Sequence, residues 1–114
     1  MPNNNLKTGL PETIAQRLET VESFTIRLTQ GWTVSFSKDR NDPNYVWVDF
    51  FYNGLPGRDE NYTMSVRIKL LSIDSLWTNT LVHTSSSSFD RSKFRGCYGI
   101  AVYRTLCDFA ERDK

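Results

Sequence analysis

The chain has little of what most catalytic and metal sites are built from. Its 114 residues include one histidine, His83, and two cysteines, Cys97 and Cys107. One histidine and two separated cysteines cannot supply the four ligands of an ordinary zinc site. No serine lies in a Gly-x-Ser-x-Gly motif, and the glycines do not form a phosphate-binding loop. We therefore expect no catalytic residues, no metal, no cofactor and no enzymatic activity.

The chain also lacks an excess of charge and a long apolar run. Its 14 basic and 13 acidic residues leave a net charge of +1, which gives no global attraction to nucleic acid or to anionic membranes. No apolar stretch approaches the ~20 residues that span a bilayer, and the N-terminus has no run typical of a secretion signal. The two cysteines fall in one predicted helix, roughly 15 Å apart at ~1.5 Å per residue, too far for a disulfide. These features predict a cytoplasmic protein with reduced thiols and no membrane partner.

A first helix is predicted after a polar tail. Residues 1–9 are rich in asparagine and are expected to be disordered, and residues 10–114 are expected to form a single α+β domain. Proline and glutamate at positions 11 and 12 suit the first turn of a helix. The helix is expected to end near Glu22. Its apolar stripe consists of Ile14, Leu18 and Val21.

From residue 24 the apolar side chains recur at every second position, as in β-strands. Four such segments, 24–29, 32–37, 45–52 and 62–71, are separated by turn-forming sequences. Short connections favour pairing between neighbours, so the pattern predicts an antiparallel meander. The loop after the second segment contains Asp39, Asn41 and Asp42, which match the start of a calcium loop but lack its glycine and glutamate. We interpret this loop as a plain turn.

Two interpretations are open for residues 72–89. The content of Trp, Thr, Leu and Val favours a fifth strand over residues 76–84, which is the interpretation we prefer. Alternatively, Asp74 caps a short helix. That helix would bring together Leu76, Trp77, Thr80 and Leu81.

A final helix is predicted to start at Asp90. Gly96 and Gly99 each cost about 1 kcal/mol relative to alanine in a helix interior, so we expect them where this helix presses on the sheet. The apolar stripe comprises Phe94, Cys97, Tyr98, Ala101, Val102, Leu106 and Phe109. The predicted fold class is α+β, an antiparallel four- to five-stranded meander with the N-terminal and C-terminal helices packed on one face. That face carries Phe24, Val34, Val48 and Val66.

The second face of the predicted sheet is not plainly polar, although a sheet with one core face usually has a polar back. Its candidate binding residues are Tyr45, Trp47, Phe51, Arg27, Arg67 and Lys69. Residues 73–89, or a second copy of the chain in a homodimer, could cover this face. It could be a protein-binding hot spot, because Trp, Tyr and Arg dominate such sites. It could also stack nucleic-acid bases, which Asp49 in its middle disfavours.

The sequence therefore predicts a small non-enzymatic protein-interaction module. Small domains without a catalytic set are often inhibitors, adaptors or immunity proteins, and a phage-type inhibitor of a host defence complex, anti-CRISPR-like, belongs to this class. The partner is expected to be a protein, with a homodimer as a further candidate. The alternative is binding of RNA or single-stranded DNA through the aromatic and basic face of the sheet.

Overall fold

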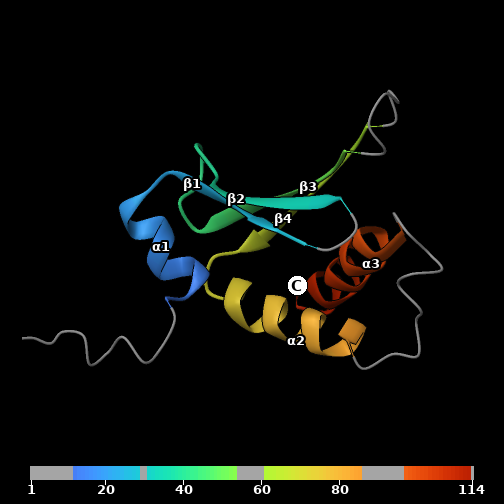
Figure 1. Cartoon of the computed structure of the whole chain (residues 1–114). Helices are drawn as coiled ribbons and strands as arrows, with labels where there is room; N and C mark the ends of the chain where they lie inside the picture. The colour runs from blue at the N-terminus through green and yellow to red at the C-terminus, as the bar shows by residue number, and fades with distance from the viewer. Residues whose placement is uncertain (1–11, 29–30, 54–60, 86–96, 114) are drawn as a thin grey trace, which may run out of the picture.

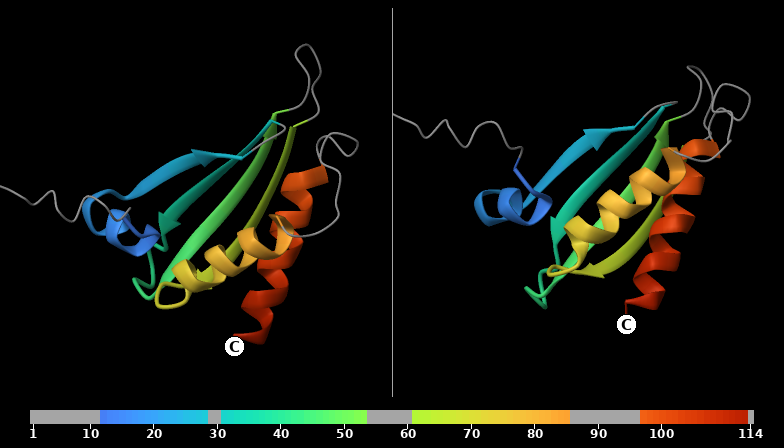
Figure 2. Two further views of the ribbon diagram at one scale, coloured as in Figure 1. Left: turned by 60° about the horizontal axis from the view of Figure 1, so that its bottom comes forward. Right: turned by 90° about the horizontal axis from the view of Figure 1, so that it is seen from below.

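The computed structural model describes residues 12–28, 31–53, 61–85 and 97–113 (Figure 1). The elements are α1 (Ile14–Thr20), β1 (Ser23–Arg27), β2 (Trp32–Lys38), β3 (Tyr45–Asn53), β4 (Asn61–Lys69), α2 (Ile73–Ser85) and α3 (Cys97–Arg112). The strands form one antiparallel sheet in the order β1-β2-β3-β4. The helices of the described residues lie on one face of this sheet (Figure 2). The predicted α+β meander with helices packed on one face is confirmed.

The core face follows the period of two seen in the sequence. Phe24, Phe36, Val48 and Val66 pair in register and form one row across the four strands. The Phe24 and Phe36 rings stack with centroids 5.3 Å apart. On the same face, five side chains of the central strands β2 and β3 are completely buried: Val34, Phe36, Val46, Val48 and Phe50. Alternation places the remaining side chains of each strand on the opposite, outer face.

The segment that follows the sheet is a helix. The preferred strand over residues 76–84 is wrong, and the helical alternative is correct. Trp77 packs edge-on against Phe36, with ring centroids 5.1 Å apart. The hydroxyl of Thr80 donates to the carbonyl of Leu76 at 2.7 Å, and Thr84 repeats the bond to Thr80 at 2.9 Å. These bonds satisfy two buried hydroxyls inside a helix, which makes threonine acceptable there.

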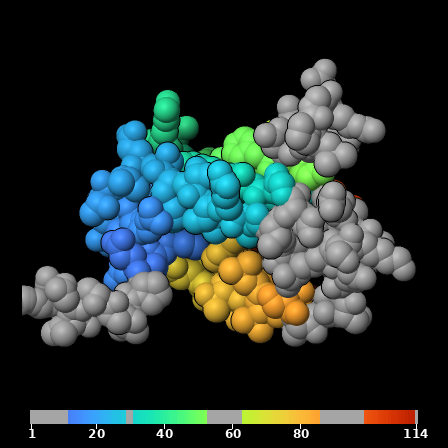
Figure 3. All heavy atoms as spheres, viewed as in Figure 1, coloured from blue at the N-terminus to red at the C-terminus, as the bar shows by residue number. Residues whose placement is uncertain are grey.

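Two groups of acceptors cap the N-terminus of α1. Thr13 is the N-cap, and its side chain and that of Gln16 form a reciprocal capping box. Asp74, from the first turn of α2, accepts hydrogen bonds from the backbone N–H groups of Ile14 at 2.7 Å and Ala15 at 3.1 Å. Asp74 therefore caps α1, whereas the sequence suggested that it caps the helix after it. The space-filling view shows α1 and β1 as one continuous surface beside α2 (Figure 3).

The apolar stripe of α1 is partly as predicted. Leu18 is buried, but the helix ends at Thr20, and Val21 is an extended C-cap that is 42% exposed. The expected helix end near Glu22 was two residues too late, and Val21 does not belong to the core. The C-cap N–H still bonds to the carbonyl of Arg17.

The helix α3 lies against β2, β3 and β4, with Val102 and Leu106 fully buried. Gly99 is buried against Trp32. The predicted close packing of this helix on the sheet is therefore confirmed at Gly99. The predicted start at Asp90, together with Phe94 and Gly96, lies outside the described residues, as do residues 1–9. In the described segments no helix has the length and apolarity needed to cross a membrane.

Candidate functional site

The outer face of the sheet carries the candidate binding residues on alternating positions of β1, β3 and β4. Trp47 is 37% exposed and Phe51 is 41% exposed, although both sit on a central strand. The interpretation in which residues 73–89 cover this face is wrong for residues 73–85, because α2 packs on the core face. Residues 86–89 lie outside the described part of the chain.

One end of the outer face is an ordered cluster around Arg67. In the register of the sheet Arg67 lies opposite Trp47, but its guanidinium extends over the ring of Tyr45, 3.8 Å from the ring centroid. Its Nε donates to Oδ2 of Asp39 at 2.7 Å. A second carboxylate, that of Asp42, lies 3.9 Å from the other end of the guanidinium. The charge of Arg67 is therefore balanced within the chain.

The partner of Arg67, Asp39, was not among the predicted site residues. Its other oxygen, Oδ1, accepts hydrogen bonds from the backbone N–H groups of Asn41 at 2.8 Å and Asp42 at 3.1 Å. The Arg67 guanidinium, followed by these N–H groups, holds the pKa of the Asp39 carboxyl below its ordinary value of 3.8. Asp39 therefore stabilises a turn by accepting hydrogen bonds from backbone N–H groups two and three residues further on. A plain turn is what the sequence predicted here in preference to a calcium loop.

The centre of the outer face is the carboxylate of Asp49. In register, Asp49 lies between Ser35 and Ser65, and Oγ of Ser65 donates to its Oδ1 at 2.5 Å. Trp47 and Phe51 lie two residues to either side along β3. No cationic side chain of the described residues lies within ion-pair distance of Asp49. Asp49 is thus an acidic group between two exposed aromatic rings.

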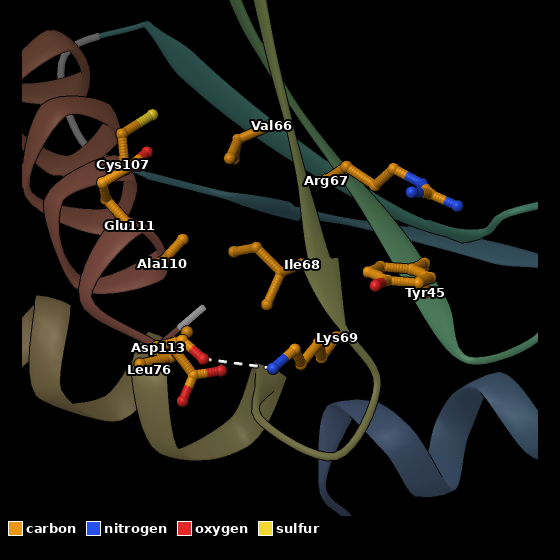
Figure 4. Close-up of a pocket in the computed structure, with 10 residues that line it drawn as sticks. All are labelled: Tyr45, Val66, Arg67, Ile68, Lys69, Leu76, Cys107, Ala110, Glu111 and Asp113. Atoms are coloured by element: carbon orange, nitrogen blue, oxygen red, sulfur yellow. Dashed lines mark hydrogen bonds between the residues drawn. The ribbon is translucent and has the colours of Figure 1, made fainter.

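The two remaining candidates, Lys69 and Arg27, are at the margins. Lys69 pairs in register with Tyr45, but its Nζ donates to the backbone carbonyl of Asp113, just past α3, at 3.1 Å (Figure 4). Arg27 is on the edge strand β1, opposite Thr33, and Thr33 in turn lies opposite Phe51. The structure therefore brings Tyr45, Trp47 and Arg67 together. Lys69 is a cross-strand neighbour of Tyr45, but its ammonium is directed to the end of α3, and Arg27 lies two strands away on β1.

A groove of about 410 Å³ runs along β4 beside α3 (Figure 4). Val66 and Ile68 point toward α3, whereas Arg67 points away. Burial raises the pKa of the Cys107 thiol in this groove, and a hydrogen bond with Tyr103 opposes that effect only in part. The thiol is therefore protonated at neutral pH and is a poor nucleophile.

The only histidine of the sequence, His83, belongs to α2. His83 lies on the exposed side of α2, with its ring edge-on to Phe109 at a centroid distance of 6.1 Å. Cys97 and Cys107 both belong to α3, so the helix itself holds their backbones too far apart for a disulfide with each other.

Comparison of the chain with protein-family models, curated proteins and solved structures finds no significant match in any of the three.

Proposed function

We propose that the chain is a non-enzymatic protein-interaction module and that it binds its partner through the outer face of the sheet. The observation that carries the proposal is the exposure of Trp47 and Phe51 on a central strand. Large aromatic side chains concentrate in the buried centres of protein interfaces, where they contribute much contact area at little conformational cost.

The surroundings of the two rings support this proposal. Trp47 and Phe51 are four residues apart, which is about 13 Å at ~3.3 Å per residue in a strand. That spacing matches a compact central patch of an interface. Between and beside them the outer face carries small hydroxyl side chains that can hydrogen-bond to a partner without blocking its approach: Thr25, Thr33, Ser35, Ser37, Thr63 and Ser65.

Binding of RNA or single-stranded DNA is the second candidate, and the stacking of Arg67 on Tyr45 beside Trp47 is the observation that favours it. The charges argue against it. Arg67 is already paired with Asp39, and Lys69 is directed toward the end of α3. A nucleic-acid track needs cations that can meet phosphates, and the centre of this face is the carboxylate of Asp49.

Within this class we propose that the chain acts as an inhibitor, adaptor or immunity protein of cytoplasmic partners, and a phage-type inhibitor of a host defence complex is one such role. The small size of the chain and its shortage of catalytic residue types support this choice over an enzyme. The identity of the partner follows from the experiment below.

Site-specific photo-cross-linking tests the proposal. A benzophenone amino acid is placed at position 47 or 51 in the full chain, and the chain is expressed in cells of the organism that encodes it. Val82, which is 61% exposed on α2, provides the matched control position. We expect discrete protein adducts from positions 47 and 51 that are absent from position 82. Adducts to nucleic acid would favour the second candidate, and equal labelling from all three positions would overturn both.

A further inference from the structure

We infer that the outer face recognises a cationic side chain of the partner, an arginine, at Asp49 between Trp47 and Phe51. This inference rests on the proposed function and names the chemistry of its central contact. The three residues alternate along one strand, so their side chains emerge on the same face, about 6.6 Å apart in steps of two residues. An arginine side chain that lay between the two rings would meet the carboxylate of Asp49.

Among the described residues, the carboxylate at the centre of this face has no cation beside it. Arg67 is the nearest cation in the register of the sheet, on the row of Trp47, but its guanidinium is bound to Asp39 and lies on Tyr45. Tyr45 and Asp39 are on the side of Trp47 that is away from Asp49. The row of Asp49 itself carries only hydroxyl side chains: Thr25, Ser35 and Ser65.

The carboxylate of Asp49 is positioned for such a contact. Ser65 donates to Oδ1 and so fixes the orientation of the group, while no hydrogen bond to Oδ2 is seen from the described residues. A guanidinium can bind a carboxylate through two parallel N–H donors, and its flat face can stack on an indole ring. Lysine would make the ion pair but would lose the planar stacking on Trp47. The site therefore favours arginine over lysine and excludes anionic groups.

Titration of the full, ¹⁵N-labelled chain with short capped peptides tests this inference. The probe is acetyl-Gly-Arg-Gly-amide, and its matched control carries citrulline, which keeps the shape of arginine without the charge. We expect saturable chemical-shift changes centred on the amides of residues 47–51 and on Ser65 with the arginine peptide alone. A lysine peptide should bind more weakly, and a glutamate peptide should not bind.

Substitutions then assign the contact to Asp49. Loss of a charge-assisted hydrogen bond should weaken binding of the arginine peptide by about tenfold or more in Asp49→Asn. Trp47→Ala should also weaken it, and Ser65→Ala should weaken it less, because Ser65 acts by positioning Asp49. Asp108→Asn, which removes the same charge from an exposed site on α3, should leave the affinity unchanged.

Two results would overturn the inference. One is equal binding of the arginine and citrulline peptides to the unmodified chain, a comparison that depends on no variant folding. The other is unchanged affinity of the arginine peptide in Asp49→Asn. The inference would be wrong, and the proposed function would stand, if protein adducts at position 47 persisted in Asp49→Asn and the chain showed no preference for the arginine peptide. Absence of adducts at positions 47 and 51 would reject the proposed function itself.

Discussion

The indole ring of Trp32 occupies the space that a Cβ atom on Gly99 would need. Trp32 is 1% exposed at the start of β2, and Gly99 is in the first turns of α3. The absence of a side chain at position 99 therefore allows α3 to lie directly on the indole ring of Trp32. Glycine at this position costs the helix about 1 kcal/mol of intrinsic propensity relative to alanine.

Substitution of Gly99 should accordingly destabilise the fold. Gly99→Ala gains helix propensity but forces Trp32 or α3 to move, and overpacking of a filled core costs roughly 1–3 kcal/mol. Gly99→Leu should cost more. Urea unfolding measures both variants, with Arg104→Ala on the exposed side of α3 as the control. In hydrogen exchange, residues 98–107 should be among the most protected, and fast exchange there would contradict this packing.

Trp47 on the outer face and Trp32 in the core allow a matched test of the outer face. Trp47→Ala should reduce stability far less than Trp32→Ala, which empties a buried site and should cost about 3–5 kcal/mol. Thermal melts at several protein concentrations separate the isolated chain from a homodimer. A large loss in Trp47→Ala that shrinks as concentration rises would show that a second copy covers this face.

Removal of the Asp74 carboxylate should loosen the start of α1 without disturbing the sheet. Loss of an N-terminal cap typically costs about 0.5–2 kcal/mol, and Asp74→Ala removes the acceptor for two N–H groups. Thr13→Ala is the matched control, because it removes the local capping box of the same helix. Hydrogen exchange at Ile14 and Ala15 should accelerate in Asp74→Ala. Unchanged exchange at both amides would contradict the long-range cap.

The ion pair of Asp39 with Arg67 should make stability depend on acid pH. The folded chain holds the pKa of Asp39 below its ordinary value of 3.8, so the unfolded chain binds this proton more readily. The stabilisation is therefore fully present above pH 3.8 and is lost as the pH falls toward the folded-state pKa. In Asp39→Asn the urea midpoint should be lower at neutral pH and should fall less on acidification. Asp108→Asn should keep the acid dependence of the unmodified chain.

Binding to nucleic acid should not be measurable at physiological salt. Fluorescence anisotropy with mixed-sequence RNA and single-stranded DNA oligonucleotides provides the measurement. A site that neutralised three phosphates would show a slope of about −2 to −3 in log affinity against log salt. Submicromolar binding that is lost in an Arg67→Ala/Lys69→Ala double variant would replace the protein-interaction proposal with the nucleic-acid one.

The sheet was predictable from the sequence because its side chains repeat with the strand period. Within each of the four segments between Phe24 and Leu70 the apolar residues lie at every second position, so they share one face of a strand and can be buried together. The short polar connections favour pairing between neighbouring strands. The same alternation predicted that Trp47 and Phe51 lie on the outer face. Close packing at Gly99 was also predictable, because glycine in a helix interior needs a compensating contact.

The nature of α2 was not predictable from residue content. Its Trp, Thr and Val residues favour strands, but propensity is a weak term beside burial. Residues 73, 76, 77, 80 and 84 recur at helical spacing, and this spacing was the signal that could have identified the helix. The threonines then bond to carbonyls of their own helix, which no strand would offer.

Only the tertiary structure decided the polar contacts between residues far apart in the sequence. Asp74 meets Ile14 across 60 residues, and Arg67 meets Asp39 across 28. The local sequence pattern does not predict such pairs. Each pair depends on the packing of whole helices and strands, which brings distant backbone and side-chain groups within hydrogen-bond distance. The sequence alone determined which face shows aromatic rings. The fold determined that Arg67 turns away from Asp49, and so left an acidic centre between those rings.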